Sequence, residues 1–265
     1  MPIHPSALIS DEAQIDPTAD IGPYVIIEGP VRIAANCRIA AHAQIIGDTH
    51  LSENTLIGRA AIIGENPQDI GFDPNTPSGV RIGKNNTIRE HVTIHRGSKP
   101  DSHTTLGDGN FLMATSHLGH DVILGDKNII ANAVLLAGHV QVGNGTFIGG
   151  GAVFHQFLRI GDGCVIQGNG SFSKDIPHFC AAQRINRVTG LNVIGLRRAG
   201  FSPDDRKSLK ALFDLIYRQG HNLTQALTAA RQQTWPEHAE KFLQFLEAHS
   251  KKGICRLSQD SSDEE

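Results

Sequence analysis

The sequence predicts a β-solenoid, namely a left-handed parallel β-helix of hexapeptide repeats, followed by a small C-terminal α-helical domain. An apolar residue recurs at every sixth position, a period that fits neither a helix of 3.6 residues per turn nor a two-residue strand alternation. Such a period is typical of a parallel β-helix. The members of this first column are Ile3, Ile9, Ile15, Ile21, Ile27, Ile33, Ile39, Ile45, Leu51, Ile57, Ile63, Ile82, Ile88, Ile94, Leu106, Leu112, Leu118, Leu124, Ile130, Leu136, Val142, Ile148, Phe154, Ile160, Ile166 and Phe172.

A second column lies four residues after the first, and its members in the opening stretch are small or β-branched. They are Ala7, Ala13, Ala19, Val25, Val31, Cys37, Ala43, Thr49, Thr55 and Ala61. We expect each hexapeptide to form one short strand and a corner, so that three of them close a triangular coil with the large residue inside. Coils should stack about 4.8 Å apart. Each coil then depends on its neighbours for stability.

Two stretches rich in proline and glycine interrupt the columns, near residues 64–81 and 97–104. Such stretches favour loops, and loops on a rigid scaffold often carry binding groups. We therefore expect a β-helix over residues 1–190 that carries two loop insertions.

The chain beyond the repeats has helical signals. Ser202 is a good N-cap, Pro203 suits the first helical position, and apolar residues follow at helical spacing from Leu209 to Tyr217. We expect a helical domain over residues 191–257 and an acidic, disordered tail over 258–265. The expected helices cover about 203–220, 223–233 and 236–249.

Composition excludes several classes of function. The chain has 265 residues, a net charge of -3 and 19% charged residues, without the basic stripe that a nucleic-acid partner requires. It has neither a long apolar run nor a signal sequence, so we expect a cytoplasmic protein without an integral membrane segment. The cysteines, Cys37, Cys164, Cys180 and Cys255, form no CxxC pair and indicate structural thiols. We expect no metal site and no cofactor.

Four of the 14 histidines indicate chemistry. His120, His139 and His155 follow one another at intervals of 19 and 16 residues, each close to one coil, and His117 lies beside His120. They should therefore stack near one edge of the prism. A histidine there could be a general base oriented by Asp121. Three histidines could instead hold zinc, as in the β-helical carbonic anhydrases, although those enzymes carry a His-x4-His pair and this chain has His-x2-His.

Several motifs together make the sequence recognisable. They are Ile63-Gly64-Glu65-Asn66-Pro67-Gln68-Asp69, Thr93-Ile94-His95-Arg96-Gly97, His117-Leu118-Gly119-His120-Asp121, Leu136-Ala137-Gly138-His139-Val140, His155-Gln156-Phe157 and Gly195-Leu196-Arg197-Arg198-Ala199-Gly200-Phe201. In this order and spacing they resemble the acyl-ACP:UDP-N-acetylglucosamine O-acyltransferases of lipid A biosynthesis, over nearly the whole chain.

The resemblance implies a catalytic set. His120 would take the proton from the 3-hydroxyl of UDP-N-acetylglucosamine, which then attacks the thioester of a (3R)-3-hydroxyacyl acyl carrier protein. Asp121 would orient the imidazole, and the backbone N–H of Gly138 would stabilise the oxyanion. The family needs no cofactor and forms a homotrimer, so both are expected here.

The resemblance also implies substrate contacts. Those to the sugar nucleotide or the pantetheine arm would be Gln68, Asp69, His117, His139, His155 and Gln156. Asn192 and Arg198 would reach the uridine diphosphate, from a neighbouring subunit, because a guanidinium offers paired donors to phosphate. Gly168 matches a position that sets the depth of the acyl pocket.

Three positions depart from the family pattern, and all concern sugar or nucleotide recognition. The chain has Gly71 where a lysine is common, Ile194 where an acid is common, and Ala199 where a second arginine is common. A 3-amino UDP-sugar as acceptor, with an amide product, therefore stays open. The alternative of another class is a catalytically idle β-helical scaffold.

Overall fold

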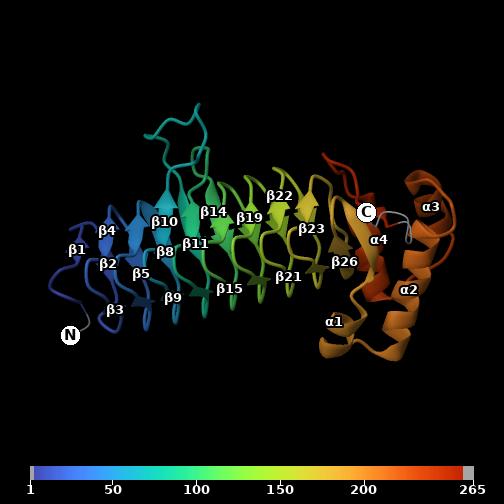
Figure 1. The fold of residues 1–265 in the computed structure, drawn as a ribbon, viewed down its shortest axis with the longest axis horizontal. Helices are drawn as coiled ribbons and strands as arrows, with labels where there is room; N and C mark the ends of the chain where they lie inside the picture. Colours follow the sequence, from blue (N-terminus) through green and yellow to red (C-terminus); the bar gives the residue numbers. More distant parts are fainter. Residues whose placement is uncertain (1–2, 259–265) are drawn as a thin grey trace.

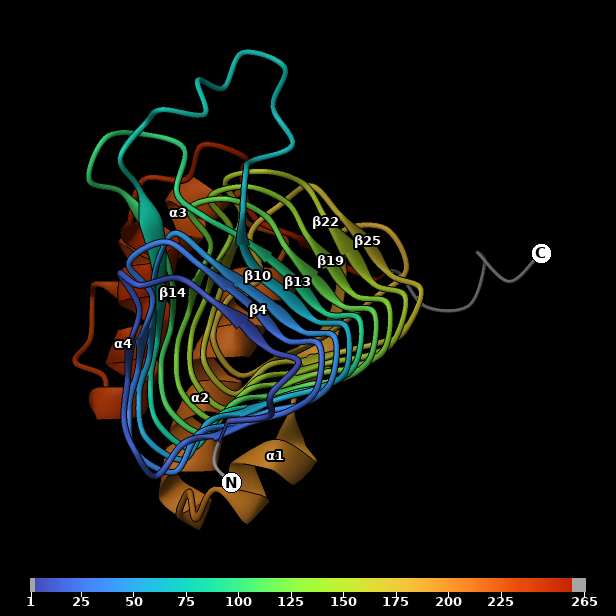
Figure 2. The ribbon, with the colours of Figure 1, turned by 90° about the vertical axis from the view of Figure 1, so that its left-hand side faces the viewer.

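The structure, a computed structural model, describes residues 3–258 and contains three sheets of short strands wound into a prism (Figure 1). The chain passes through the three sheets in turn in each coil, so that Figure 2, viewed along the prism, shows stacked triangular coils. All strand pairs but one are parallel in the described residues; β26 and β27 pair antiparallel. The β-helix predicted from the sequence is confirmed.

The sheets are named by their strand numbers over residues 3–258. The nine-stranded sheet contains β1 (Leu8–Ile9), β4 (Ile26–Glu28), β7 (Gln44–Ile46), β10 (Ile62–Glu65), β13 (Thr93–His95), β16 (His117–Leu118), β19 (Leu135–Leu136), β22 (Val153–Phe154) and β25 (Ser171–Phe172). The eight-stranded sheet contains β2 (Gln14–Ile15), β5 (Arg32–Ile33), β8 (Asp48–Leu51), β11 (Gly79–Ile82), β14 (His103–Leu106), β17 (Ile123–Leu124), β20 (Gln141–Val142) and β23 (Arg159–Ile160). The eleven-stranded sheet contains β3 (Asp20–Ile21), β6 (Arg38–Ile39), β9 (Leu56–Ile57), β12 (Thr87–Ile88), β15 (Phe111–Leu112), β18 (Ile129–Ile130), β21 (Phe147–Ile148), β24 (Val165–Ile166), β26 (Cys180–Gln183), β27 (Arg187–Leu191) and β28 (Arg256–Leu257).

The first column fills the interior of the prism. Parallel pairing places its members directly above one another, as in Leu118 against Leu136, and from Ile21 to Phe172 they are buried. Only the first coil is open, since Ile3 keeps 40% of its surface exposed. The core is therefore a stack of apolar side chains, aliphatic except for Phe154 and Phe172, which fixes the spacing of the residues on the outside.

The two interruptions of the columns leave the prism as loops on the same side (Figure 2). The first connects β10 to β11 and the second connects β13 to β14. Arg96, at the start of the second loop, donates hydrogen bonds to Asn66 Oδ1 and to the carbonyls of Pro74 and Thr76 in the first loop. These bonds hold the two loops together beside the central coils.

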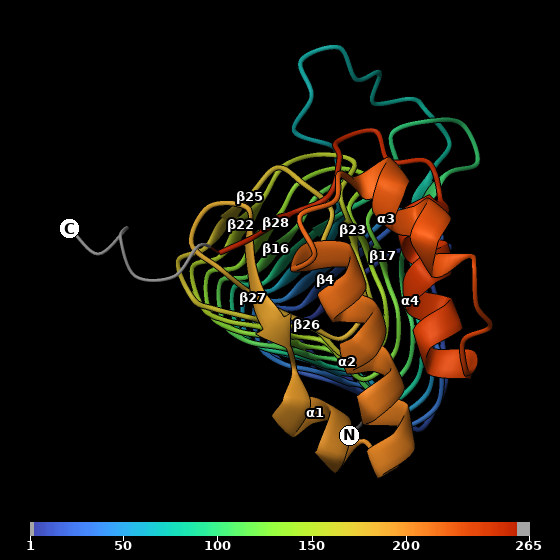
Figure 3. The ribbon, with the colours of Figure 1, turned by 90° about the vertical axis from the view of Figure 1, so that its right-hand side faces the viewer.

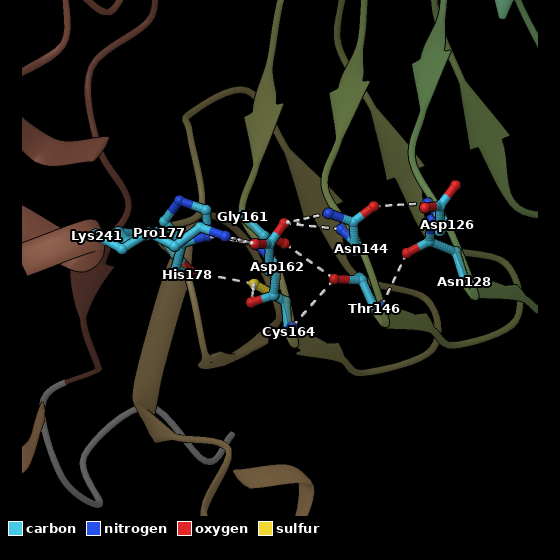
Figure 4. A network of polar contacts seen from close by, with 10 residues as sticks. All are labelled: Asp126, Asn128, Asn144, Thr146, Gly161, Asp162, Cys164, Pro177, His178 and Lys241. Atoms are coloured by element: carbon cyan, nitrogen blue, oxygen red, sulfur yellow. Dashed lines mark hydrogen bonds and ion pairs between the residues drawn. The ribbon is translucent and has the colours of Figure 1, made fainter. Parts of the chain in front are cut away.

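One corner of the prism carries a ladder of buried amides in the second column. Asn110 N–H donates to Asn86 Oδ1, and Asn128 N–H donates to Asn110 Oδ1, each at 2.8 Å. Thr146 N–H continues the ladder to Asn128 Oδ1, and Cys164 N–H donates to Thr146 Oγ1 (Figure 4). Each side chain thus satisfies a backbone group of the next coil that would otherwise be buried without a partner.

A second ladder, of charged and polar side chains, runs beside the first and ends at the helical domain (Figure 4). Asp126 N–H donates to Asn144 Oδ1, Asn144 N–H to Asp162 Oδ1, and Asp162 N–H to His178 Nδ1 at 2.7 Å. Lys241 of α4 (Glu237–Glu247) forms an ion pair with Asp162. His178 therefore accepts a hydrogen bond at the junction, which requires a neutral ring.

Acid is expected to destabilise the protein through His178. Burial lowers the pKa of His178 to about 4, against 6.5 ordinarily, although Asp162 opposes the shift. Between these values the unfolded chain binds more protons than the folded one, so stability falls as pH drops from 6.5 towards 4, by about 3 kcal/mol for this residue. Urea unfolding at pH 7 and 4.5 should show a smaller loss for His178→Gln, which can still accept from Asp162 N–H. Equal losses in both proteins would contradict the assignment.

The helical domain covers the C-terminal end of the prism (Figure 3). Its helices are α1 (Val193–Arg198), α2 (Pro203–Tyr217), α3 (Leu223–Ala230) and α4. Ser202 caps α2 in a capping box with Asp205, as its sequence signature indicates. Helix α1 and strand β28, which returns to pair with β27, were not predicted. No helix in residues 3–258 is both long and apolar enough to cross a membrane.

A buried ion pair joins this domain to the last coils. Asp175 is 1% exposed and accepts from Arg159 Nε at 2.8 Å and from Arg159 N–H at 2.9 Å. The guanidinium also lies 4.5 Å from the centroid of the Phe245 ring of α4. Asp175 N–H donates to Gly253 O, and Cys255 N–H donates to Asp175 O. The segment after α4 is therefore fixed to the prism.

The predicted acidic tail lies, from residue 259 onwards, outside the described residues.

Candidate active site

The histidines gather at the corner between the nine-stranded and eight-stranded sheets. The turn after β16 carries His120, and the turns one and two coils further on carry Gly138 and Gln156 at the equivalent position. A cavity of about 510 Å³ opens on the outer face of the nine-stranded sheet beside these turns. Its lining residues are Gln68, His95, His117, Gly119, His120, Leu135, Ala137, Gly138, Val153, Phe154, His155, Gln156, Ser171, Phe172 and Ser173.

His120 and Asp121 form a close pair at the cavity. His120 Nδ1 lies 2.8 Å from Asp121 Oδ2, and the two side chains keep only 15% and 10% of their surface exposed. An ionised carboxylate only accepts hydrogen bonds, so Nδ1 carries the proton and Nε2 is left with its lone pair. That tautomer is the one a general base needs.

The second loop fixes Asp121 in its ionised form. Ser98 donates to the carboxylate through Oγ at 2.6 Å and through its N–H at 3.1 Å, and Asp121 N–H donates to Thr104 Oγ1. Burial raises the pKa of Asp121, but the hydrogen bonds from Ser98, His120 and Ser102 outweigh it, so the pKa lies below its usual value. The negative charge that stabilises an imidazolium is therefore retained at neutral pH.

The His120 ring packs directly against Gly138. A Cβ atom at this position would lie 2.5 Å from both Cε1 and Nε2 of His120. The Gly138 carbonyl accepts from Phe157 N–H, whereas its own N–H has no acceptor among the described residues. The glycine thus lets the imidazole lie directly on the backbone and leaves one buried donor free beside the base.

His117 is held neutral behind the base. Its Nδ1 lies 2.7 Å from Thr93 Oγ1, and its ring contacts His95 edge to face at a centroid distance of 4.9 Å. Burial lowers the pKa of His117 to about 4, and the neighbouring His95 and His120 add to this effect. His117 is therefore an uncharged hydrogen-bonding group at neutral pH.

Some of the other predicted site residues lie near the His120–Asp121 pair. His139 Nε2 lies 3.6 Å from Asp121 Oδ2, and its ring is stacked on Phe157 at 4.5 Å. His155 and Gln156 line the cavity two coils beyond His120. Gln68 also reaches it from the first loop.

Asp69, Gly168, Asn192 and Arg198 are not among the residues that line the cavity. Asp69 is exposed and accepts from Gly71 N–H within its loop. A Cβ atom at Gly168 would lie 2.8 Å from Gly150 O, so this glycine permits close coil stacking. Asn192 caps α1, at whose end Arg198 is exposed.

Two residues at this corner were missed by sequence reasoning. His95 is 5% exposed and lines the cavity, and Ser98 anchors Asp121. The available signal was the Thr93–Gly97 motif, which contains His95 and directly precedes Ser98. Ile94 keeps its place in the six-residue period, but the second loop begins directly after β13, so the period does not place Ser98.

One group of three side chains could hold a metal ion. The ligand atoms of His120, Asp121 and His139 all lie within 4.8 Å of one another. Two imidazoles and a carboxylate suit a divalent metal such as zinc. The same atoms suit proton transfer, because His120 Nδ1 already has Asp121 as its hydrogen-bond partner. Geometry alone thus permits both chemistries predicted from the sequence.

Comparison with known proteins shows the family to which the chain is related. A family model described as UDP N-acetylglucosamine O-acyltransferase, domain 2, matches residues 175–255. The acyl-[acyl-carrier-protein]–UDP-N-acetylglucosamine O-acyltransferase of Paraburkholderia xenovorans is 44% identical over 96% of this chain and 99% of its own length. That of Thermodesulfovibrio yellowstonii is 43% identical, with the same shares covered.

A solved structure agrees with the sequence relatives. The UDP-N-acetylglucosamine O-acyltransferase of Moraxella catarrhalis superimposes with a TM-score of 0.92 at 36% identity, covering 97% of this chain and all of that chain. The resemblance read from the motifs thus extends to the fold as well as to the whole sequence. The chain belongs to the acyl-[acyl-carrier-protein]–UDP-N-acetylglucosamine O-acyltransferase family.

Proposed function

We propose that the protein transfers a (3R)-3-hydroxyacyl chain from acyl carrier protein to the 3-hydroxyl of UDP-N-acetylglucosamine, the first step of lipid A biosynthesis. The observation that carries this proposal is the His120–Asp121 pair at a cavity, with the free N–H of Gly138 beneath the imidazole. An acyl transfer needs a base for the hydroxyl and a donor for the oxyanion. This corner supplies both.

In the proposed mechanism, His120 Nε2 takes the proton of the sugar hydroxyl as its oxygen attacks the thioester carbonyl. Asp121 stabilises the imidazolium that forms. The carbonyl oxygen becomes negatively charged and accepts from Gly138 N–H. The tetrahedral intermediate then collapses, the carbon–sulfur bond breaks, and His120 returns the proton to the leaving sulfur. No metal or cofactor takes part in these steps.

The remaining predicted residues are assigned to substrate binding. Gln68, His117, His139, His155 and Gln156 lie in or beside the cavity, where they can orient the sugar or the pantetheine arm. Gly168 stays a proposed determinant of acyl length, and Asp69 a proposed sugar contact. The apolar part of the cavity wall, which includes Leu135, Val153 and Phe172, suits an acyl chain.

We further propose that three chains complete the site. Asn192 and Arg198 lie outside the cavity of their own chain, so a role for them in diphosphate binding needs a neighbouring subunit. Two adjoining faces of the prism carry exposed apolar side chains, with Leu135 on the nine-stranded sheet and Ile129 and Phe147 on the eleven-stranded sheet. Packing one face against the other around a threefold axis gives a closed ring.

Light scattering on the purified protein should therefore give the mass of a trimer. Substituting Phe147, which is 40% exposed, with Asp should shift the mass towards the monomer, since a carboxylate would be buried in the interface. A matched change of Ile123, exposed on the eight-stranded sheet, to Asp should leave the mass unchanged. A monomeric wild-type protein would contradict the shared site.

The function is tested with purified protein, UDP-N-acetylglucosamine, its 3-amino analogue, and 3-hydroxyacyl carrier proteins of several chain lengths. Ester formation on UDP-N-acetylglucosamine supports the proposal, and acylation of the amino analogue alone would replace it with amide formation. No product from any pair would favour the idle scaffold. A chelator added to one series tests the metal chemistry, because His120, Asp121 and His139 would lose a bound ion.

The cytoplasmic location expected from the sequence stays a prediction.

A further inference from the structure

A row of stacked groups leads away from the catalytic pair along the edge of the prism. The His139 ring meets the His120 ring edge to face at 5.0 Å, and Phe157 stacks on His139 at 4.5 Å. The ammonium of Lys251 lies 4.6 Å from the centroid of the Phe157 ring. His139 and Phe157 occupy equivalent turns in successive coils. The row therefore follows the prism axis from the base to a lysine of the C-terminal segment.

The backbone that carries Lys251 is held in place. Gly253 O and Cys255 N–H both form hydrogen bonds with the backbone of Asp175. The buried side chain of Asp175 forms an ion pair with Arg159. The Lys251 side chain itself is exposed and forms no ion pair within residues 3–258. A cation–π contact at an exposed site is weak, so the ammonium is free to bind an anion.

Lys99, exposed on the second loop, adds to the positive charge there. Burial lowers the pKa of His139, and Lys99 and Lys251 both lower it further, against the effect of Asp121. Both ammonium groups therefore lie near enough to act on the His139 ring. Neither takes part in the proposed acyl transfer, and both add positive charge to this edge of the site, where Asp121 is the opposing negative group.

Distance selects between the two phosphate-bearing substrates of the proposed reaction. Phe157 lies about two coils beyond His120, roughly 10 Å along the prism axis, and the Lys251 ammonium lies 4.6 Å from the centroid of its ring. An extended phosphopantetheine arm spans roughly 15 Å from its sulfur to its phosphorus. The diphosphate of a UDP-sugar is attached to the same six-membered ring as the reacting hydroxyl and so lies much closer to His120. The far position of Lys251 fits the arm.

We propose that Lys251 binds the phosphodiester of the carrier protein's phosphopantetheine arm. This inference rests on the proposed function and names the group through which the donor substrate is recognised. An ammonium is a compact charge that binds phosphate oxygens without a fixed orientation. With the phosphodiester held there, an extended arm brings its thioester to the His120 corner. Lys251 is thus a determinant of donor specificity that takes no part in proton transfer.

The test compares two small donors, a 3-hydroxyacyl phosphopantetheine and the same 3-hydroxyacyl pantetheine without phosphate, at saturating UDP-N-acetylglucosamine. The wild-type enzyme should use the phosphorylated donor about tenfold better in kcat/KM. Lys251→Ala should lose this preference and keep its KM for UDP-N-acetylglucosamine. Lys252→Ala, which removes the adjacent lysine, should behave as wild type. A phosphate preference that Lys251→Ala retains would overturn the inference.

Calorimetry separates this inference from the proposed function. Phosphopantetheine should bind wild-type protein about tenfold more tightly than pantetheine does, and Lys251→Ala should bind both equally. If that pattern is found but no UDP-sugar is acylated, the proposed reaction fails and the phosphate site stands. If acylation proceeds and Lys251→Ala binds phosphopantetheine as wild type does, the phosphate site is wrong and the reaction stands.

Discussion

Replacing His120 by alanine is expected to lower kcat by about 10²–10⁴-fold, the range that a general base contributes. Asp121 and the free Gly138 N–H would remain, but no group would take the proton of the attacking hydroxyl. The fold should survive because the His120 side chain lies outside the aliphatic core, in a turn whose neighbours Leu118 and Val122 fill the interior.

The loss is measured as ester formation under saturating substrates, with circular dichroism to confirm the fold. His91→Ala provides a matched control, since His91 is an exposed corner histidine that does not line the cavity. It should retain full turnover. If His120→Ala were as active as His91→Ala, the base would lie elsewhere, with His139 and His155 as the next candidates.

Replacing Gly138 by alanine should be nearly as damaging, although it adds a single methyl group. The new Cβ would lie 2.5 Å from two atoms of the His120 ring, so the imidazole must move. The 2.8 Å contact with Asp121 would then be lost. A displacement of about 1 Å in a catalytic group can cost about 10²-fold in rate. Alanine keeps the backbone N–H that would stabilise the oxyanion. The loss of activity therefore measures the displacement of His120 and not the removal of that donor.

A paired variant separates this effect from the general cost of adding a methyl group. Gly190→Ala places its Cβ where no heavy atom lies within 4 Å, and it should leave kcat unchanged. The NMR signals of the His120 ring, followed in both variants, should shift in Gly138→Ala only. Full turnover by Gly138→Ala would mean that the His120 ring does not lie on this glycine during catalysis.

The coils could be predicted from the sequence because their energetics are local. A residue such as Leu118 belongs to a column that recurs every six residues and pairs with Leu136 in the next coil, so one period describes both its place and its partner. Helix α1 and strand β28 depend on partners far along the chain instead. Arg256 pairs with Arg187, for example, and neither residue belongs to a repeat that would reveal the pairing.

The site could be predicted in part for the same reason. His120 and Gly138 meet because they are 18 residues apart, which is one coil, and the repeat supplies that spacing. Ser98 reaches Asp121 from a loop whose length the period does not govern. Asn192 was predicted to bind the nucleotide, but in one chain its side chain caps α1. Only the arrangement of several chains can decide its role, and a single sequence contains no pattern for that.

The buried amide ladder has a consequence for how the chain avoids misfolding. A solenoid with a six-residue period could slip by one unit and still place aliphatic residues in aliphatic positions. Such a frameshift would remove Asn110 from between Asn86 and Asn128, and would leave buried amides opposite valine or alanine. Each unsatisfied group would cost about 1–3 kcal/mol. The amides therefore stabilise one assignment of the hexapeptides to the three sheets over the two assignments that are shifted by one unit. Only in the native assignment does His120 lie over Gly138.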